Sequence, residues 1–408
     1  MNKQRVVISG CGVVTAAGTE LEPFWQSLMA GTCHIEPLRN FAVSELGPLL
    51  GAQVELPDED RLPERIDSDP IRARCLELAR AAVRRGMLDA GLSIDAEGRD
   101  ATGVVFATTM GEERQVGDLS ERRSSQGDDC IDASFFTRAN NHRLASVVAS
   151  HYGFGGPVLL AESACSSGNA AIAVAYDLIA SGAAERMIVG GADTFTRLIY
   201  CGFRRMGALS PGICKPFDKN RDGVSFGEGA GVVVLESLAS AQRRGKLPRA
   251  ELAGYGVSND AHHVTAPGPH GEGFVRAIAQ ALASSGIARE QVHYVSAHGT
   301  GTVYNDRGES EALVSAFGEH AKHVPMSSIK SMIGHTNGAA SVIEAVVCTL
   351  ALQQQAVPPT AGLVTPDPDF ELDYVPRIGR AHRVETCLSL AAGFGGFNVC
   401  LALKRFHE

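Results

Sequence analysis

The sequence predicts an α/β fold of two related halves, in which each sheet is covered by helices on both faces. Residues 158–163 (VLLAES), 165–182 (CSSGNAAIAVAYDLIASG) and 186–193 (RMIVGGAD) read in turn as a strand, a helix and a strand. The helical segment is apolar on nearly every side, which is typical of a buried helix. A second succession of strand, loop and apolar helix follows at 324–354. Strands that flank buried helices require a sheet covered on both faces.

The earlier elements of the first half follow from local patterns. Residues 5–9 (RVVIS) read as a strand, and Gly10 and Gly12 after them lack the third glycine of a dinucleotide-binding loop. The other segments are assigned by periodicity and polarity: helices at 20–30 and 71–91, the latter ending at Gly91, a buried strand at 103–107, a polar surface loop at 113–130 and a helix at 140–152.

The second half repeats this kind of alternation. Residues 292–302 (VHYVSAHGTGT) form a strand that runs into a glycine-rich loop, and 387–404 read as a hairpin that turns at its glycines. No Pro/Ser-rich linker separates the halves. We therefore expect two tightly packed halves, an N-terminal one at 1–255 that carries Cys165 and a C-terminal one at 256–408 with two histidines in glycine-rich loops.

Composition narrows the possible functions. The chain has 408 residues, 44% of them hydrophobic and 20% charged, which is ordinary for a globular protein. A net charge of −9 without a basic block argues against a nucleic-acid partner. The chain begins without an apolar leader segment, and its longest apolar run, 339–352, is interrupted by Glu344. We expect a soluble cytoplasmic protein that does not enter a membrane.

The ten cysteines are scattered without a CxxC pair or a zinc-like spacing, so we expect no metal site. Cys165 differs from the others because it lies where a strand meets a buried helix, among small residues. The helix N-terminus favours a thiolate, which would lower the pKa of this thiol and make it a nucleophile. The alternative is a cysteine that only packs at a helix start.

Two histidines lie in glycine-rich loops after strands, His298 in SAHGTGT and His335 in SMIGHTNGAA. Either one alone could be structural. Lys330 and Glu344 flank His335 in sequence and could pair inside the protein, where a buried charge needs a partner, and so orient that ring. A cysteine protease or amidase would use one histidine with an Asn or Asp to hold it. Two neutral imidazoles suit instead the enolate formed when a malonyl thioester loses carbon dioxide.

These segments resemble the elongating β-ketoacyl-acyl-carrier-protein synthases, the synthase II group and its polyketide ketosynthase relatives. The resemblance covers essentially the whole chain and rests on these motifs: RVVISGCGVVTAAG, SACSSG, GGAD, KPFDKNRDGVSFGEGAGVVVLE, AHGTGT, SSIKSMIGHTNGAA, QAVPPT and GFGGFN. It implies the thiolase fold, two duplicated α/β halves in a five-layered α-β-α-β-α arrangement, usually as a homodimer.

The resemblance also implies roles for individual residues. Cys165 matches the acyl-accepting nucleophile, and His298 and His335 match the pair that promotes decarboxylation. Lys330 and Glu344 match the residues that support this pair. The remaining matches are Phe394, a gate whose N–H would complete an oxyanion hole with that of Cys165; Thr300 and Thr302, which would bind phosphopantetheine; and Asp306 and Glu309, for which a structural role is favoured.

The implied reaction is a decarboxylative Claisen condensation in two thioester exchanges, so the chain would be an acyltransferase. The acyl group would pass from acyl carrier protein to Cys165, and malonyl-carrier protein would then supply the attacking enolate. Substrates arrive on the phosphopantetheine of the carrier protein, so no metal and no organic cofactor is expected.

The chain departs from the family pattern around the acyl pocket. We assign Met110, Phe136, Thr137 and Phe203 to this pocket, with Phe135 and Phe136 near a dimer interface. The departures leave open whether the pathway is fatty-acid or specialised polyketide or polyene synthesis. The candidate cations for docking an acidic carrier protein are Arg72, Arg74, Arg204 and Arg205.

Three other interpretations stay open at this point. A non-catalytic, chain-length-determining partner subunit of a ketosynthase heterodimer would generally lack the nucleophile, whereas Cys165 and both histidines are present. A thiolase acting on coenzyme A esters has other cysteine and histidine contexts. A priming-type synthase would pair its cysteine with one His and one Asn. The dimer itself could be a homodimer or a heterodimer with a related ketosynthase subunit.

Overall fold

The computed structural model of the chain describes residues 4–39, 41–60, 73–92, 99–131, 135–136 and 139–407. Its strands are β1 (Val6–Val14), β2 (Ile35–Pro37), β3 (Leu50–Ala52), β4 (Thr102–Ala107), β5 (Val158–Ala161), β6 (Arg186–Asp193), β7 (Phe226–Gly227), β8 (Gly229–Ser237), β9 (Ala250–Asn259), β10 (Tyr294–Ser296), β11 (Met326–Ser327), β12 (Ala356–Val357), β13 (Arg380–Ala381), β14 (Thr386–Gly393) and β15 (Phe397–Arg405). Its helices are α1 (Leu21–Met29), α2 (Arg74–Ala90), α3 (Glu113–Gln126), α5 (Arg143–Tyr152), α6 (Ser167–Ala180), α7 (Arg197–Arg205), α8 (Leu238–Arg243), α9 (Glu272–Ser285), α10 (Val303–Phe317), α11 (Lys330–Ile333) and α12 (Ala340–Gln354).

The main sheet shows that the two halves repeat one topology. Its strand order is β11-β10-β14-β15-β9-β1-β8-β6-β4-β5, so the halves meet where β9 lies against β1. Numbered in chain order within its own half, each set of five strands runs 3-2-4-5-1. The first three strands of this order are parallel in both halves, and the last two pairings are antiparallel. This repeat confirms the predicted duplication.

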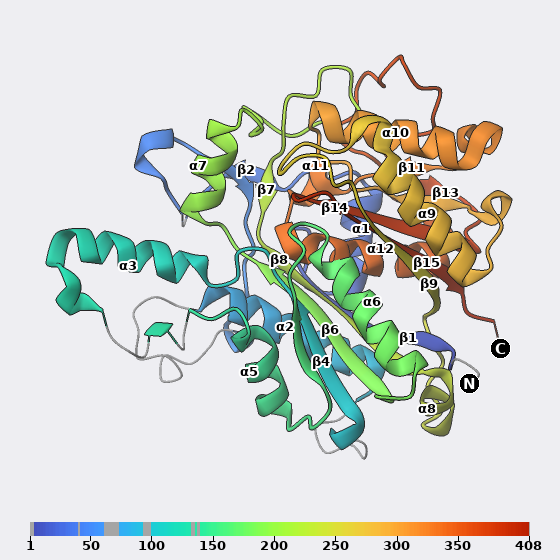
Figure 1. The fold of residues 1–408 in the computed structure, drawn as a ribbon, viewed down its shortest axis with the longest axis horizontal. Helices are drawn as coiled ribbons and strands as arrows, with labels where there is room; N and C mark the ends of the chain where they lie inside the picture. The colour runs from blue at the N-terminus through green and yellow to red at the C-terminus, as the bar shows by residue number, and fades with distance from the viewer. Residues whose placement is uncertain are drawn as a thin grey trace.

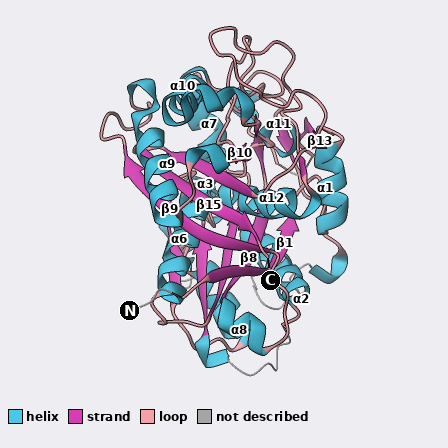
Figure 2. Cartoon of the chain, turned by 90° about the vertical axis from the view of Figure 1, so that its right-hand side faces the viewer, coloured by secondary structure: helices cyan, strands magenta, loops and turns pink. Residues whose placement is uncertain are grey.

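The layers follow from where the apolar side chains lie. Helices α6 and α12 pack against each other between the two halves of the sheet, inside one large apolar core (Figure 1). A second core lies under α2 and α5 on the N-terminal half, and a third lies under α9 and α10 on the C-terminal half. Figure 2 shows helices on both sides of the strands. The five-layered arrangement is therefore confirmed. The division at residue 255 stays a prediction, and this residue lies within β9.

Glycines in β1 explain one sequence pattern that resembled a nucleotide loop. A β-carbon on Gly10 would lie 2.5 Å from the amide nitrogen of Ala90, and one on Gly12 would lie 2.2 Å from the carbonyl oxygen of Ala82. Both atoms belong to α2, so these glycines let α2 lie directly on the strand. Helix α2 ends as predicted at Gly91, which caps it in the left-handed conformation with φ of 66°.

The prediction of a surface loop at 113–130 is wrong, because Glu113–Gln126 form helix α3. The segment is rich in Glu, Gln and Arg, which favour helices even without a continuous apolar face. Gln115 and Leu119 are its buried residues, and Gly127 ends it. High polarity in this segment therefore does not indicate a loop. No helix in the described ranges is long and apolar enough to cross a membrane.

Candidate active site

Cys165 lies in a tight turn between the end of β5 and the start of α6. Ala164 adopts a left-handed conformation with φ of 51°, which turns the chain sharply just before the thiol. The turn is closed by the amides of Ser166 and Ser167, which donate to the carbonyl oxygens of Ser163 (3.2 Å) and Ala164 (3.1 Å). These hydrogen bonds hold Ala164 in a conformation that residues other than glycine seldom adopt.

The predicted lowering of the Cys165 pKa is wrong for the resting chain. Burial raises the pKa of this thiol to about 12, and the nearby Lys330 charge opposes the rise only in part. Solvent still reaches the side chain, yet the surrounding protein desolvates the sulfur. Cys165 also precedes Ser166, the N-cap of α6, so it stands outside the first helical turn. At neutral pH the thiol is therefore protonated before substrate binds.

His298 and His335 come from different loops and meet in the same site. Their ring centroids are 5.5 Å apart, and the ring planes are nearly perpendicular. Within the described chain, Nδ1 of His298 and both ring nitrogens of His335 are buried without a hydrogen-bond partner. Burial and the Lys330 charge hold the pKa of both rings well below the usual 6.5. Both imidazoles are therefore neutral at pH 7, and their nitrogens remain available for a ligand.

Lys330 and Glu344 form the predicted ion pair, and each side chain is only 1% exposed. The ammonium also donates to the carbonyl oxygen of His298 at 2.5 Å. Burial raises the pKa of Glu344 to about 7, and Lys330 opposes this rise. The expectation that this pair orients His335 needs correction, because Lys330 bonds directly to the His298 backbone.

His335 is held instead by the neighbouring chain around β7. Its amide donates to the carbonyl oxygen of Ser225 at 2.7 Å, and its own carbonyl accepts from the amide of Gly227 at 3.1 Å. Its ring lies nearly parallel to that of Phe226, with centroids 6.3 Å apart. Short backbone pairing therefore fixes the second imidazole.

Two carboxylates of α10 hold the loop that carries His298. Glu309 accepts from the amides of His298 (2.6 Å) and Gly299 (2.8 Å). Asp306 accepts from the amide of Thr300 at 3.1 Å. These contacts agree with the structural role favoured from the sequence. The hydroxyls of Thr300 and Thr302 lie 2.8 Å apart on the same loop.

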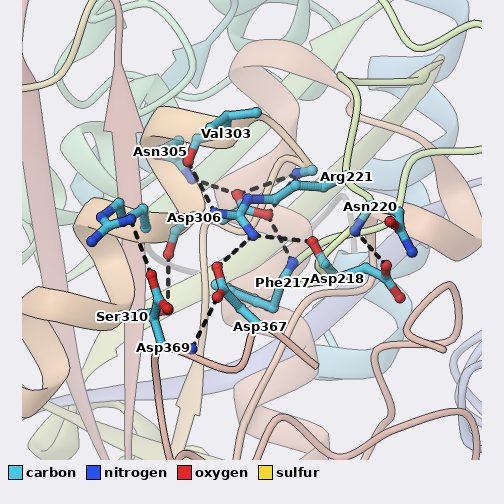
Figure 3. Close-up of polar contacts among 12 residues, drawn as sticks. Phe217, Asp218, Asn220, Arg221, Val303, Asn305, Asp306, Ser310, Asp367 and Asp369 are labelled. Carbon is cyan, nitrogen blue, oxygen red and sulfur yellow. Dashed lines mark hydrogen bonds and ion pairs between the residues drawn. The ribbon is translucent and has the colours of Figure 1, made fainter. Parts of the chain in front are cut away.

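A second set of contacts supports this loop from the segment at 215–223, as Figure 3 shows. Phe217 has φ of 60°, and its amide donates to Asp306 at 2.8 Å. A β-carbon on Gly299 would lie 2.8 Å from the Phe217 ring, so glycine is required there. Arg221 donates to the carboxylate of Asp367 at 2.7 Å and to the carbonyl oxygen of Val303 at 3.3 Å. No sequence pattern predicts this support: Arg221 lies inside the motif at 215–236, but its partner Asp367 lies outside every motif.

Phe394 lies in the turn between β14 and β15, and its side chain is 37% exposed. Its ring stacks on Phe203 with centroids 5.4 Å apart, and Phe203 meets the edge of Phe226 at 4.9 Å. Met110 packs into the same apolar cluster as Phe203. A β-carbon on Gly393 would lie 3.2 Å from the amide nitrogen of Cys165. The turn that carries Phe394 therefore lies against the backbone of Cys165.

Several predicted residues lie elsewhere. The side chain of Phe136 is 68% exposed, so it is not part of the buried site of its own chain, and Thr137 lies outside the described residues. The proposal of Arg74 as a docking cation is wrong, because it is paired with the buried Glu228. Arg72 also lies outside the described residues, whereas Arg204 and Arg205 are exposed.

The assembled groups define what the site can do. A thiol, two neutral imidazoles with free nitrogens and a buried cation suit transfer of an acyl group to sulfur and stabilisation of an enolate. Among the described residues, no group of three or more His, Cys, Asp or Glu side chains is arranged to hold a metal ion.

Comparison with known proteins agrees with this geometry. The chain matches the family described as "Beta-ketoacyl synthase, N-terminal domain" over residues 3–241 and that described as "Beta-ketoacyl synthase, C-terminal domain" over 249–364. It is 38% identical over 414 residues to the 3-oxoacyl-[acyl-carrier-protein] synthase 2 of Synechocystis sp., covering 100% of this chain and 99% of the relative.

Solved structures of ketosynthases share the fold of this chain over nearly its whole length. One is the ishigamide ketosynthase/chain length factor, with a TM-score of 0.91 and 35% identity, covering 99% of this chain and 100% of that one. Another is a type II PKS acyl-carrier protein in complex with its ketosynthase bound to the hexaketide, with a TM-score of 0.90, 32% identity and the same coverage.

Proposed function

The chain belongs to the β-ketoacyl synthase family, and we propose that Cys165, His298 and His335 carry out its acyl transfer and condensation. The protein is an acyltransferase that joins an acyl chain to a malonyl unit with loss of carbon dioxide. The observation that supports these roles best is the pair of neutral imidazoles, whose buried nitrogens have no partner in the described chain.

In the loading step, the sulfur of Cys165 bonds to the acyl carbonyl carbon, and the bond to the incoming pantetheine sulfur breaks. The thiol proton of Cys165 leaves with that pantetheine sulfur, so no external base is consumed. This coupling matters because the resting thiol, with a pKa of about 12, is not ionised at neutral pH. The amides of Cys165 and Phe394 would stabilise the oxyanion, as their adjacent backbones allow.

In the condensation step, His298 and His335 donate N–H groups to the thioester oxygen of the malonyl unit. Its carbon–carbon bond to the carboxylate breaks, carbon dioxide leaves, and the electron pair forms an enolate. The enolate carbon attacks the acyl carbon on Cys165, and the cysteine sulfur leaves and regains a proton from solvent. Neutral imidazoles suit this step because burial and Lys330 disfavour their protonation.

The carrier of both substrates is proposed to be acyl carrier protein with a phosphopantetheine arm. One similar solved structure pairs an acyl-carrier protein with its ketosynthase. Thr300 and Thr302 would bind the arm, and the exposed Arg204 and Arg205 would dock an acidic carrier. The proposed reaction needs no metal and no organic cofactor. A cytoplasmic location stays a prediction.

We also propose that the chain acts as a dimer through the free edge of β5. This strand ends the main sheet, and the exposed side chain of Leu159 makes the edge partly apolar. Phe136 would then reach the pocket of the partner. A similar solved structure joins a ketosynthase and a chain length factor, so the partner is a second copy or a related ketosynthase subunit.

The interpretation as a non-catalytic partner subunit is less well supported, because the thiol and both imidazoles are assembled. The decisive experiment is intact-mass analysis after incubation with acyl-carrier proteins of varied chain length. Wild-type protein should gain the acyl mass, and Cys165→Ala should gain none. If Cys165→Ala still loads and condenses, the nucleophile is assigned wrongly. The preferred chain would also separate a fatty-acid from a polyketide or polyene pathway.

A further inference from the structure

Asp193, the last residue of β6, is fully buried, and its carboxylate accepts five hydrogen bonds. Oδ1 accepts from the hydroxyl of Thr108 (2.7 Å) and from the amides of Met110 (2.9 Å) and Gly111 (3.0 Å). Oδ2 accepts from the amides of Thr109 (2.8 Å) and Gly338 (2.7 Å). All five of these partners of the Asp193 carboxylate are hydrogen-bond donors.

These five donors belong to two segments with different tasks. Residues 108–111 follow β4 and carry Met110, which packs with Phe203 beside the site. Gly338 follows His335 by three residues and belongs to the other half of the chain. The two segments touch, since a β-carbon on Gly338 would lie 2.5 Å from the carbonyl carbon of Thr108. One carboxylate thus joins the pocket wall to the imidazole loop.

We propose that Asp193 is a positioning residue that sets acyl-chain selectivity and malonyl decarboxylation together, by fixing Met110 and the loop of His335 to one carboxylate. This inference rests on the proposed function of His335 and of the pocket. No atom of Asp193 needs to touch a substrate for it to act in this way.

Asp193 can act in this way because a neutral group of the same shape cannot accept all five of the hydrogen bonds that its carboxylate accepts. An asparagine keeps one acceptor oxygen and would turn an NH₂ group toward amides that also donate. Amides left unpaired in a buried site are costly, so at least one segment must move. Displacements of about 1 Å in a catalytic site are enough to change rates by a large factor.

The test compares Asp193→Asn with Thr108→Val and with the control Glu236→Gln. Glu236 is equally buried, but its partners are Arg186, Arg244 and Ser240. In the β6–β8 register Glu236 faces Arg186, seven residues before Asp193, so it lies about 23 Å from the site. Thr108→Val removes contacts of the pocket segment and leaves Gly338 in place.

Two rates are measured for each folded variant. One is loading of Cys165 from acyl-pantetheine thioesters of four, eight and twelve carbons, followed by intact mass. The other is release of carbon dioxide from malonyl-pantetheine. We expect Asp193→Asn to change the ratio of loading rates between long and short chains by about tenfold and to slow decarboxylation by a similar factor. Thr108→Val should change the ratio alone, and Glu236→Gln neither.

The inference is overturned if Asp193→Asn slows all chain lengths by one common factor, or if Glu236→Gln shifts the ratio as strongly. If Asp193→Asn does not fold, Thr108→Val decides, and an unchanged loading ratio in that variant overturns the inference. Failure of the proposed function looks different, because the wild-type protein would then neither load nor decarboxylate.

Discussion

The ammonium of Lys330 lies 2.5 Å from the carbonyl oxygen of His298, and it also forms a buried ion pair with Glu344. This single cation therefore has two tasks. It fixes the backbone of one imidazole, and its charge lowers the pKa of both rings. One buried cation therefore both positions the His298 loop and helps to keep the two imidazoles neutral.

Replacement of Lys330 by Met should cost both stability and decarboxylation. Removal of Lys330 leaves Glu344 buried without its partner, and because burial already raises the pKa of this carboxyl group, it takes up a proton at neutral pH. Loss of the pair is expected to destabilise the fold by at most about 3–5 kcal/mol. The double variant Lys330→Met/Glu344→Gln removes both charges and should recover much of this stability. Urea denaturation measures the first effect and carbon dioxide release the second. Recovery of decarboxylation together with stability in the double variant would contradict a positioning role.

The thiol of Cys165 should alkylate slowly at neutral pH. Because burial raises its pKa to about 12, the thiolate fraction, and with it the rate of reaction with iodoacetamide, should rise about tenfold per pH unit between pH 7 and 9. The measurement is intact mass over time in a Cys33→Ser/Cys130→Ser/Cys201→Ser background, since Cys33 is exposed and the other two are partly exposed, as Cys165 is. A rate that levels off below about pH 8 would show that the start of α6 outweighs burial.

Local sequence patterns were sufficient to place the thiol and the imidazoles. Cys165 lies between a strand and a buried helix, and His298 is the second residue after β10, so short-range alternation determines where both occur. The pKa of Cys165 was predicted in the wrong direction for a related reason. A helix start can be read from adjacent residues, whereas desolvation depends on chain segments far away in sequence.

The contacts that support the site could not be predicted from sequence patterns, because they join residues far apart in the sequence. Asp193 binds Gly338 across 145 residues, and Arg221 binds Asp367 across 146. Most of the donors to Asp193 are backbone amides, which every residue type except proline carries, so no motif marks them. Helix α3 was missed for a different reason, because helix-favouring polar residues without an apolar stripe resemble a loop.

The rings of Phe203 and Phe394 should stabilise each other measurably. They stack with centroids 5.4 Å apart and planes 11° from parallel. A double-mutant cycle with Phe203→Ala, Phe394→Ala and the double variant should give a coupling free energy of about 1 kcal/mol in urea denaturation. Additive losses would mean that the stack contributes nothing and that the turn at 394–396 is held by its backbone contacts alone.

The ionisation of His298 and His335 should be absent over the range in which ordinary histidines titrate. The pKa of both rings lies well below 6.5, because burial and the Lys330 charge disfavour the imidazolium. Their ring resonances in NMR spectra should therefore stay constant from about pH 8 to pH 6, a range in which an unperturbed imidazole takes up its proton.

The same shifts predict how pH acts on stability through these two residues. A ring whose pKa is lowered by folding binds its proton more readily in the unfolded chain, so its contribution to the free energy of unfolding falls as pH drops below about 6.5. His298→Gln lacks this proton-binding site. As the pH falls, the wild type should therefore lose stability relative to the variant. The limiting slope is about 1.4 kcal/mol per pH unit. A difference independent of pH from about 7 to 5 would mean that His298 titrates normally in the folded protein, and its role as a neutral donor would then fail.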